Sequence, residues 1–290
     1  MAQGSRVCTK CGRLNAAEDK VCYNCGQRLP GPMVRSAFAF LADFSEDGLP
    51  VTKLVAGLCI VVYVLSLIGD RGFDVGGLLS GPGALSALLR FGILYKGLAW
   101  AEPWRFLSAV FMHFGLLHIG MNLLSLVNLG RTLEPHFGSA RFAILYVVAG
   151  VLGFVGSQVW YDHFSAYHTS PPTAGASGAI FGLLGAFIGV LWARRHPNWG
   201  RMLVNYLVYA AILGWVFPAN NAAHISGFAV GVVVGALFER EPSPRKRDGL
   251  MRILAGICLL CCALSVVLSA SSPVWKQVRE YERAEDSASD

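Results

Sequence analysis

Seven long apolar runs constrain this chain more than any other feature of its sequence. Each approaches the roughly 20 residues that a helix needs to cross a hydrocarbon layer about 30 Å thick. Charged residues are only 14% of the chain, against about a quarter in soluble domains. We therefore predict an all-α polytopic membrane protein. The runs are Leu54–Gly69, Phe106–Gly130, Phe142–Tyr161, Ala174–Ala193, Met202–Phe217, Ala222–Phe238 and Met251–Ala270.

The distribution of charge predicts how these spans are oriented. The net charge of +6 does not indicate nucleic-acid binding, because the basic residues lie between the runs and form no continuous basic patch. Connections 162–173 and 218–221 contain no Lys or Arg, whereas the alternate connections are basic. The positive-inside rule then predicts a multi-pass protein of the inner or plasma membrane, with a cytoplasmic N-terminus and an outer C-terminus. The first residues lack an apolar signal-peptide core, so we expect the first span to act as an uncleaved insertion signal.

Two pairs of cysteines precede the first span. A tetrahedral Zn²⁺ site is typically formed by four thiolates from two such Cys-x-x-Cys pairs, and the metal supplies folding free energy that so short a segment cannot obtain from burial. Disulfides or a redox dithiol are the alternatives, but the inferred cytoplasmic side and the absence of a βαβ pattern disfavour both. Residues 1–28 are thus predicted to be a zinc ribbon that docks an unknown cytoplasmic partner. The predicted ligands are Cys8, Cys11, Cys22 and Cys25.

The remaining boundaries follow from composition. We expect a proline-containing linker over 29–50, a six-span core over 51–240, an additional C-terminal span over 250–270 and a polar, mobile tail over 271–290.

Polar residues inside the apolar runs are the candidate site, because an unpartnered polar group in lipid costs several kcal/mol. His118 and Asn122 share a helix face at i, i+4 spacing, and His113 lies in the same run. Ser177 opens the fourth run and His224 opens the sixth, so both are expected at the same depth.

Stripes of glycine accompany Ser177 and His224. Small residues at four-residue spacing let helix backbones approach closely in a membrane, so the fourth and sixth spans are expected to pack together. A serine hydroxyl becomes a nucleophile when a base such as His accepts its proton. No Asp or Glu lies within these spans to complete a triad, so the chemistry is predicted to use a dyad. The backbone N–H of Ser177 and the side chains of His118 and Asn122 could stabilise the oxyanion.

These residues, taken together in order and placement, resemble the rhomboid family over roughly residues 51–238. The resemblance implies that Ser177 is the nucleophile, His224 the general base, and His118 and Asn122 oxyanion donors. It implies that Phe181 packs on the catalytic imidazole, at a position that is Tyr in many members. The matching motifs are Trp104-Arg105, His113-x4-His118-x3-Asn122, Gly175-Ala176-Ser177-Gly178 and His224-x2-Gly227-x3-Gly231.

The resemblance, with a seventh span after a six-span core, is to the bacterial type of family member. It implies an endopeptidase without a catalytic cofactor, which cleaves transmembrane segments of other membrane proteins near the outer face of the lipid bilayer. Two alternatives stay open. An inactive relative would bind transmembrane helices without cutting them, but such proteins typically lack the Ser or the His. A helix-bundle transporter should show intramembrane charges, which these spans lack.

Overall fold

The computed structural model describes residues 5–7, 14–16, 21–22, 24–26, 49–69, 75–95, 97–165, 171–216, 220–241 and 244–289. The chain divides into two compact units, Met1–Gly48 and Leu49–Asp290. In the first unit, strands β1 (Ser5–Val7) and β2 (Leu14–Ala16) pair in antiparallel fashion, with Ser5 opposite Ala16. Cys8 and Cys11 lie outside the described residues, as do 27–48, which contain most of the expected linker.

The second unit is built from helices. They are α2 (Pro50–Ile68), α3 (Val75–Ser80), α4 (Leu85–Arg90), α5 (Arg105–Ser108), α6 (Leu116–Phe137), α7 (Ser139–His163), α8 (Ser177–Ala193), α9 (Trp199–Val216), α10 (Asn221–Glu239), α11 (Pro244–Ser271) and α12 (Val274–Ser289).

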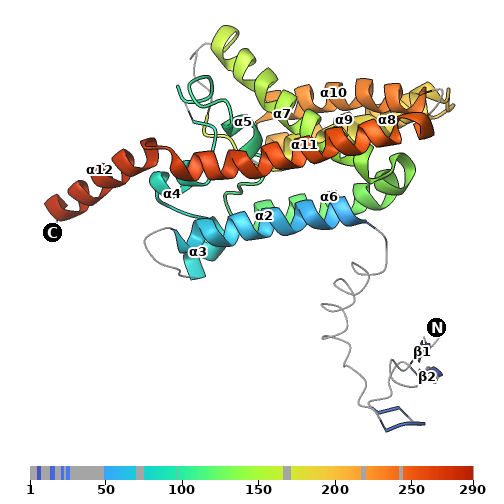
Figure 1. Cartoon of the computed structure of the whole chain (residues 1–290), viewed down its shortest axis with the longest axis horizontal. Helices are drawn as coiled ribbons and strands as arrows, with labels where there is room; N and C mark the ends of the chain where they lie inside the picture. Colours follow the sequence, from blue (N-terminus) through green and yellow to red (C-terminus); the bar gives the residue numbers. More distant parts are fainter. Residues whose placement is uncertain are drawn as a thin grey trace. The chain divides into compact units, whose positions relative to one another are not determined.

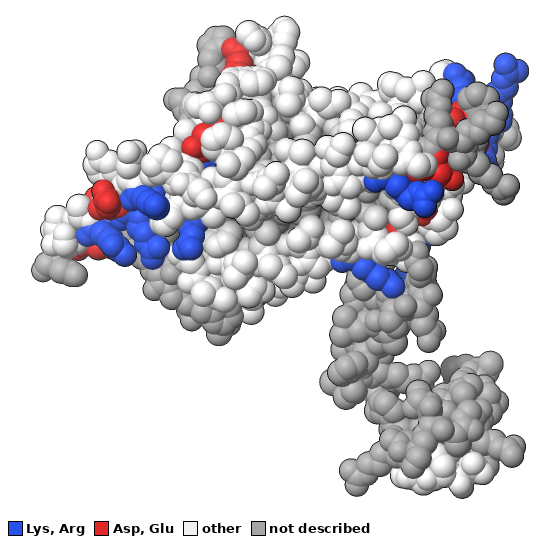
Figure 2. Space-filling model, viewed as in Figure 1, with Lys and Arg blue, Asp and Glu red and all other residues white. Residues whose placement is uncertain are grey.

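Several of these helices have the length and apolar character of membrane spans. Among the described residues, four stretches qualify by length and composition, namely α2, α7, α10 and the stretch Asp248–Ala288, while α8 is apolar but shorter. Helices α6 and α9 occupy the positions of the other two expected spans. On the face drawn in Figure 2, charged side chains gather toward the two ends of the helical unit, and few interrupt the belt between them. The prediction of a helical, polytopic membrane protein is confirmed.

Helices α7, α8 and α10 pack against one another and form the centre of the bundle (Figure 1). Helix α2 packs beside α6, and α11 packs against α7. The interior side chains include Tyr146, Phe142 and Leu183, which are fully buried. Because α8 and α10 both begin at the same end of this centre, the first turns of these two helices are neighbours.

A buried carboxylate determines where α2 begins. The first N–H groups of any helix have no partner within the helix. Here the Glu134 side chain of α6 accepts hydrogen bonds from the backbone N–H groups of Val51 and Thr52, both at 2.9 Å, and from the Thr52 hydroxyl at 2.6 Å. The Ser139 hydroxyl donates to the same carboxylate at 2.7 Å. This charged group is 1% exposed and fully hydrogen-bonded, so it joins three helices.

Two expected spans begin later than their apolar runs. The second run starts at Phe106, but α6 begins only at Leu116, after the short helix α5 and an irregular segment. The fourth run starts at Ala174, but α8 begins at Ser177, because Gly175 has φ +124°, which a helix does not allow. Hydrophobicity predicted the runs and could not predict these backbone changes within them.

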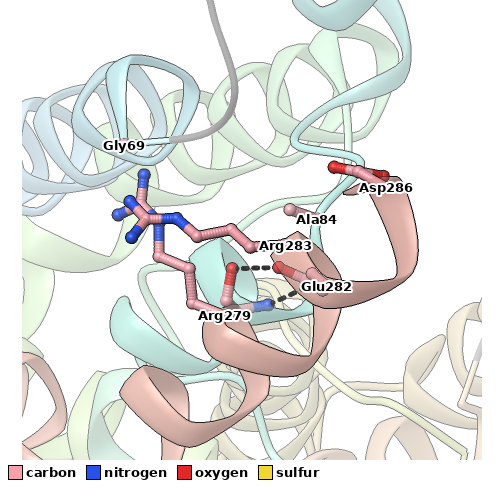
Figure 3. A pocket seen from close by; sticks show the side chains of 7 residues that line it. Gly69, Ala84, Arg279, Glu282, Arg283 and Asp286 are labelled. Carbon is pink, nitrogen blue, oxygen red and sulfur yellow. Dashed lines mark hydrogen bonds between the residues drawn. The ribbon is translucent and has the colours of Figure 1, made fainter. Parts of the chain in front are cut away.

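The polar tail that we expected to be mobile from residue 271 instead forms helix α12, which packs against α4. The N–H and hydroxyl of Ser86 donate to the two carboxylate oxygens of Glu282, and both groups line a small hollow beside α12 (Figure 3). The Arg90 guanidinium lies 5.0 Å from the Trp275 ring centroid. These contacts with residues about 190 positions earlier supply partners that the composition of the tail did not predict.

Candidate active site

Ser177 and His224 are brought together at the first turns of α8 and α10. The Nε2 atom of His224 lies 2.8 Å from the hydroxyl oxygen of Ser177, a hydrogen-bonding distance. Both residues are half-buried, so the pair is enclosed by the bundle without being sealed in it. The geometry allows the imidazole to accept the serine proton.

The ring of Phe181, one turn after Ser177, lies parallel to the His224 ring. The ring centroids are 4.2 Å apart and the planes differ by 8°. Within the described part of the chain, the hydrogen bond to Ser177 is the only one recorded for the His224 side chain. No carboxylate there orients the imidazole, so the stacked phenyl ring and the serine hydroxyl hold it in place.

Glycines account for the close approach of α8 and α10. A Cβ added to Gly227 would overlap the carbonyl oxygen of Gly178, and one added to Gly231 would overlap that of Gly182. A Cβ on Gly235 would come within 2.5 Å of the Ala186 Cα. The structure therefore shows the packing that the glycine stripes predicted, with backbone directly against backbone.

The segment that leads to Ser177 is held by backbone hydrogen bonds. Thr173 pairs with Leu94 through both its N–H (2.9 Å) and its C=O (3.0 Å), and the Gly175 N–H donates to the Ala109 carbonyl at 2.8 Å. Position 175 also leaves no room for a side chain, because a Cβ there would lie 2.8 Å from Cε1 and Nε2 of His118.

His113 supports this segment and does not contact the pair. Its Nδ1 lies 3.1 Å from the Phe111 carbonyl oxygen, and its Nε2 lies 3.4 Å from the backbone nitrogen of Ala176. A carbonyl can only accept and an N–H can only donate, so these partners assign the proton to Nδ1 and make Nε2 the acceptor. The side chain is fully buried in the irregular segment before α6, and not on the helix that we expected there.

His118 and Asn122 lie on one face of α6, as the i, i+4 spacing predicted. The backbone N–H of Phe114 donates to Nδ1 of His118 at 3.4 Å, which leaves the proton on Nε2, one of the two ring atoms that would lie 2.8 Å from a Cβ at Gly175. The Asn122 amide nitrogen donates to the His118 carbonyl at 2.8 Å, and its second hydrogen has no recorded acceptor among the described residues.

Trp104 and Arg105 lie in the connection between α4 and α6, and no hydrogen bond from either to Ser177 or His224 is recorded among the described residues. The guanidinium of Arg105 is fully buried and donates to Glu102 at 2.6 Å and to the carbonyl oxygens of Leu89 and Ile93. Burial lowers the pKa of Arg105, and the hydrogen bond and charge of Glu102 oppose that shift. Arg105 thus organises the connection that supplies Leu94 and Ala109 to the segment before Ser177.

Two contributors were missed by reasoning from the sequence. Glu102 accepts from Arg105 and also, at 2.6 Å, from the Ser272 hydroxyl that follows α11. Its i, i+3 spacing from Arg105 was a readable signal. Asn220, the N-cap of α10, had no signal beyond its position before an apolar run.

In the N-terminal unit, Cys22 is buried and Cys25 is half-buried. The backbone N–H of Gly26 donates to the Cys22 carbonyl at 3.0 Å, with Gly26 at φ +71°. This tight turn places the second Cys-x-x-Cys pair in one loop. No cluster of three potential metal ligands occurs among the described residues, which exclude Cys8 and Cys11.

A serine hydroxyl hydrogen-bonded to an imidazole, within a bundle of apolar helices, is the arrangement expected of a serine hydrolase that works inside a membrane. The comparison with known proteins agrees, since residues 101–241 match the Rhomboid domain. Rhomboid protease GlpG of Salmonella typhi is 33% identical over 222 residues, covering 72% of this chain and 70% of that protein. Rhomboid protease GluP of Bacillus subtilis is 34% identical over 227 residues, covering 76% of this chain but only 40% of that protein. The chain belongs to the rhomboid family of intramembrane serine endopeptidases.

Proposed function

We propose that Ser177 and His224 are a catalytic dyad that cleaves transmembrane segments of other membrane proteins. The 2.8 Å contact between the Ser177 hydroxyl and His224 Nε2 carries this proposal. As the Ser177 oxygen attacks the scissile carbonyl carbon, His224 takes its proton and then gives it to the leaving amine. A water molecule then attacks the acyl-enzyme. His224 takes a proton from this water and gives it to the Ser177 oxygen as the acyl bond breaks.

The oxyanion of each tetrahedral intermediate needs hydrogen-bond donors. We propose three donors, namely the backbone N–H of Ser177, the Nε2–H of His118 and the second amide hydrogen of Asn122. Ser177 is the first residue of α8, so its N–H has no acceptor within the helix. Removing one such donor is expected to slow cleavage by about 100- to 1,000-fold.

Cleavage is proposed to occur near the outer membrane face, with the N-terminus of the chain in the cytoplasm. The outer connections inferred from the positive-inside rule, which contain no Lys or Arg, include Thr173 and Asn220, just before the two proposed catalytic residues. A substrate helix must unwind before its carbonyl can be attacked, so we expect cuts where Gly and other small or helix-weakening residues occur.

The test is cleavage of a single-span substrate by the detergent-purified full chain, combined with fluorophosphonate labelling. Wild type should cut and be labelled at Ser177, whereas Ser177→Ala should do neither. His224→Ala should fold and be labelled far more slowly. Cleavage that survives Ser177→Ala would refute the proposed mechanism.

The cysteine pairs are proposed to hold one structural Zn²⁺, which would stabilise the N-terminal unit and play no part in catalysis. Two observations support the fit. The β1–β2 hairpin flanks Cys8 and Cys11 in sequence, and the turn at Gly26 gathers Cys22 and Cys25. We also propose that this unit binds a cytoplasmic partner.

Metal analysis of the purified full chain should find one zinc per molecule. Cys22→Ser should lose it, whereas Cys258→Ser, in α11, should retain it. Equal zinc content in both variants would contradict the assignment.

A further inference from the structure

Asn220 joins three parts of the bundle through one side chain. Its carbonyl oxygen accepts from the Ala223 N–H at 3.1 Å, which caps α10. Its amide nitrogen lies 2.7 Å from the Ser157 hydroxyl of α7 and 2.9 Å from the Thr173 hydroxyl in the segment before α8. An N-cap needs only the oxygen. Both amide hydrogens are therefore used for a purpose beyond capping.

The roles at Thr173 are fixed by its other contacts. Its hydroxyl hydrogen is directed at the Pro171 carbonyl, 2.8 Å away, so the hydroxyl oxygen is the acceptor for Asn220. Thr173 is 6% exposed, and its backbone is already paired with Leu94 on both sides. Thr173 is therefore held in place, and its hydrogen bond with the Asn220 amide links the start of α10 to it.

The two residues of this bridge have equivalent sequence positions relative to the two residues of the dyad. Thr173 precedes Ser177 by four residues, and Asn220 precedes His224 by four residues. Apart from the Ser177–His224 contact itself, it is the only side-chain hydrogen bond recorded between the segment entering α8 and the start of α10 in the described parts of both. It joins residues that lie four positions before each dyad residue, whereas the glycine contacts extend down the helices.

We propose that Asn220 is a positioning residue, which sets the register of His224 against Ser177 by binding Thr173. The proposal rests on the catalytic dyad proposed above. A displacement of reacting groups by about 1 Å can cost about 100-fold in rate. Loss of the bridge should therefore lower kcat by about 10- to 100-fold. Little change in KM is expected, because the bridge is proposed to align the reacting groups and not to bind substrate.

The test uses two substitutions that break the bridge and spare the cap. Thr173→Val keeps the shape of the side chain but removes the acceptor, and Thr173→Ser restores it. Asn220→Ser keeps a capping oxygen on a side chain too short to reach Thr173. For each purified full-length variant we would measure kcat, KM, the thermal midpoint and the rate constant for labelling of Ser177 by a fluorophosphonate.

We expect slower labelling and lower kcat in Thr173→Val and in Asn220→Ser, and rates near wild type in Thr173→Ser. The double variant Thr173→Val/Asn220→Ser should be no slower than the slower of its two single variants. Three outcomes would overturn the inference: a wild-type labelling rate in Thr173→Val, an equal loss of rate in Thr173→Val and Thr173→Ser, or additive losses of rate in the double variant. A smaller labelled fraction with an unchanged rate constant would also overturn it, since that marks only misfolding. Failure of wild type itself to be labelled would instead contradict the dyad.

Discussion

Substituting Gly231 with Ala tests whether backbone contact between α8 and α10 builds the active site. An ideal Cβ at this position overlaps the Gly182 carbonyl oxygen and lies 2.6 Å from its carbon and 2.8 Å from the Gly182 Cα. Carbon atoms prefer separations of about 3.5–4.0 Å, so the two helices must move apart by about 1 Å. All three neighbouring atoms are backbone, so no side chain can rotate away to relieve the clash.

The expected cost has two parts. Overpacking of this kind destabilises a protein by about 1–3 kcal/mol. A separation of about 1 Å between the helices that carry Ser177 and His224 is expected to slow cleavage by about 100-fold. The thermal midpoint and the kcat for a single-span substrate, both measured in the same detergent, would report the two effects separately.

Gly57→Ala is the matched control, because an added Cβ on this α2 glycine meets nothing within 4 Å. In an open helix interior, Ala is favoured over Gly by about 0.5–1 kcal/mol, so this variant should be at least as stable as wild type. If Gly231→Ala kept the stability and cleavage rate of the control, the backbone contact would not be what positions the dyad.

Two further variants separate orientation of the imidazole from stability of the fold. Phe181→Leu removes the ring stacked on His224 and should lower kcat by up to about 10-fold, since aromatic pairs contribute about 0.5–1.5 kcal/mol, whereas Phe181→Tyr should retain the rate. Comparable rates in Leu and Tyr would argue against a role for stacking. Glu134→Ala leaves the Val51 and Thr52 N–H groups buried without an acceptor and should cost about 2–6 kcal/mol in unfolding free energy, at about 1–3 kcal/mol per group. The exposed Glu285→Ala should cost almost nothing, and equal midpoints for the two would show that the Glu134 cap is dispensable.

Helix α11 is connected to the candidate site in a way that the family resemblance did not suggest. Ser269, near the end of α11, lies 3.1 Å from Ser108, and Ser272 donates to the buried Glu102. Ser108 adjoins Ala109, whose carbonyl binds Gly175. Helix α11 and the residue after it therefore contact the connection that supports the segment before Ser177.

Several properties were determined by the sequence alone, most of them because they depend on residues that are close along the chain. Apolar run length predicted the membrane-spanning class, i, i+4 spacing placed His118 and Asn122 on one face, and repeated glycines predicted close packing of the fourth and sixth spans. The identities of Ser177 and His224 as the candidate pair followed from their order and placement.

Only the tertiary structure decided which distant groups complete these local signals. It showed that His113 binds the backbone of Ala176, that Glu134 caps α2, and that Asn220 reaches Thr173 across 47 positions. It also showed that the expected tail contains a helix, α12, whose Glu282 binds Ser86, 196 positions earlier in the chain. A buried polar group must find a partner, but any of many residues could serve. Which one does so depends on how the helices pack, and no local pattern in the sequence encodes that choice.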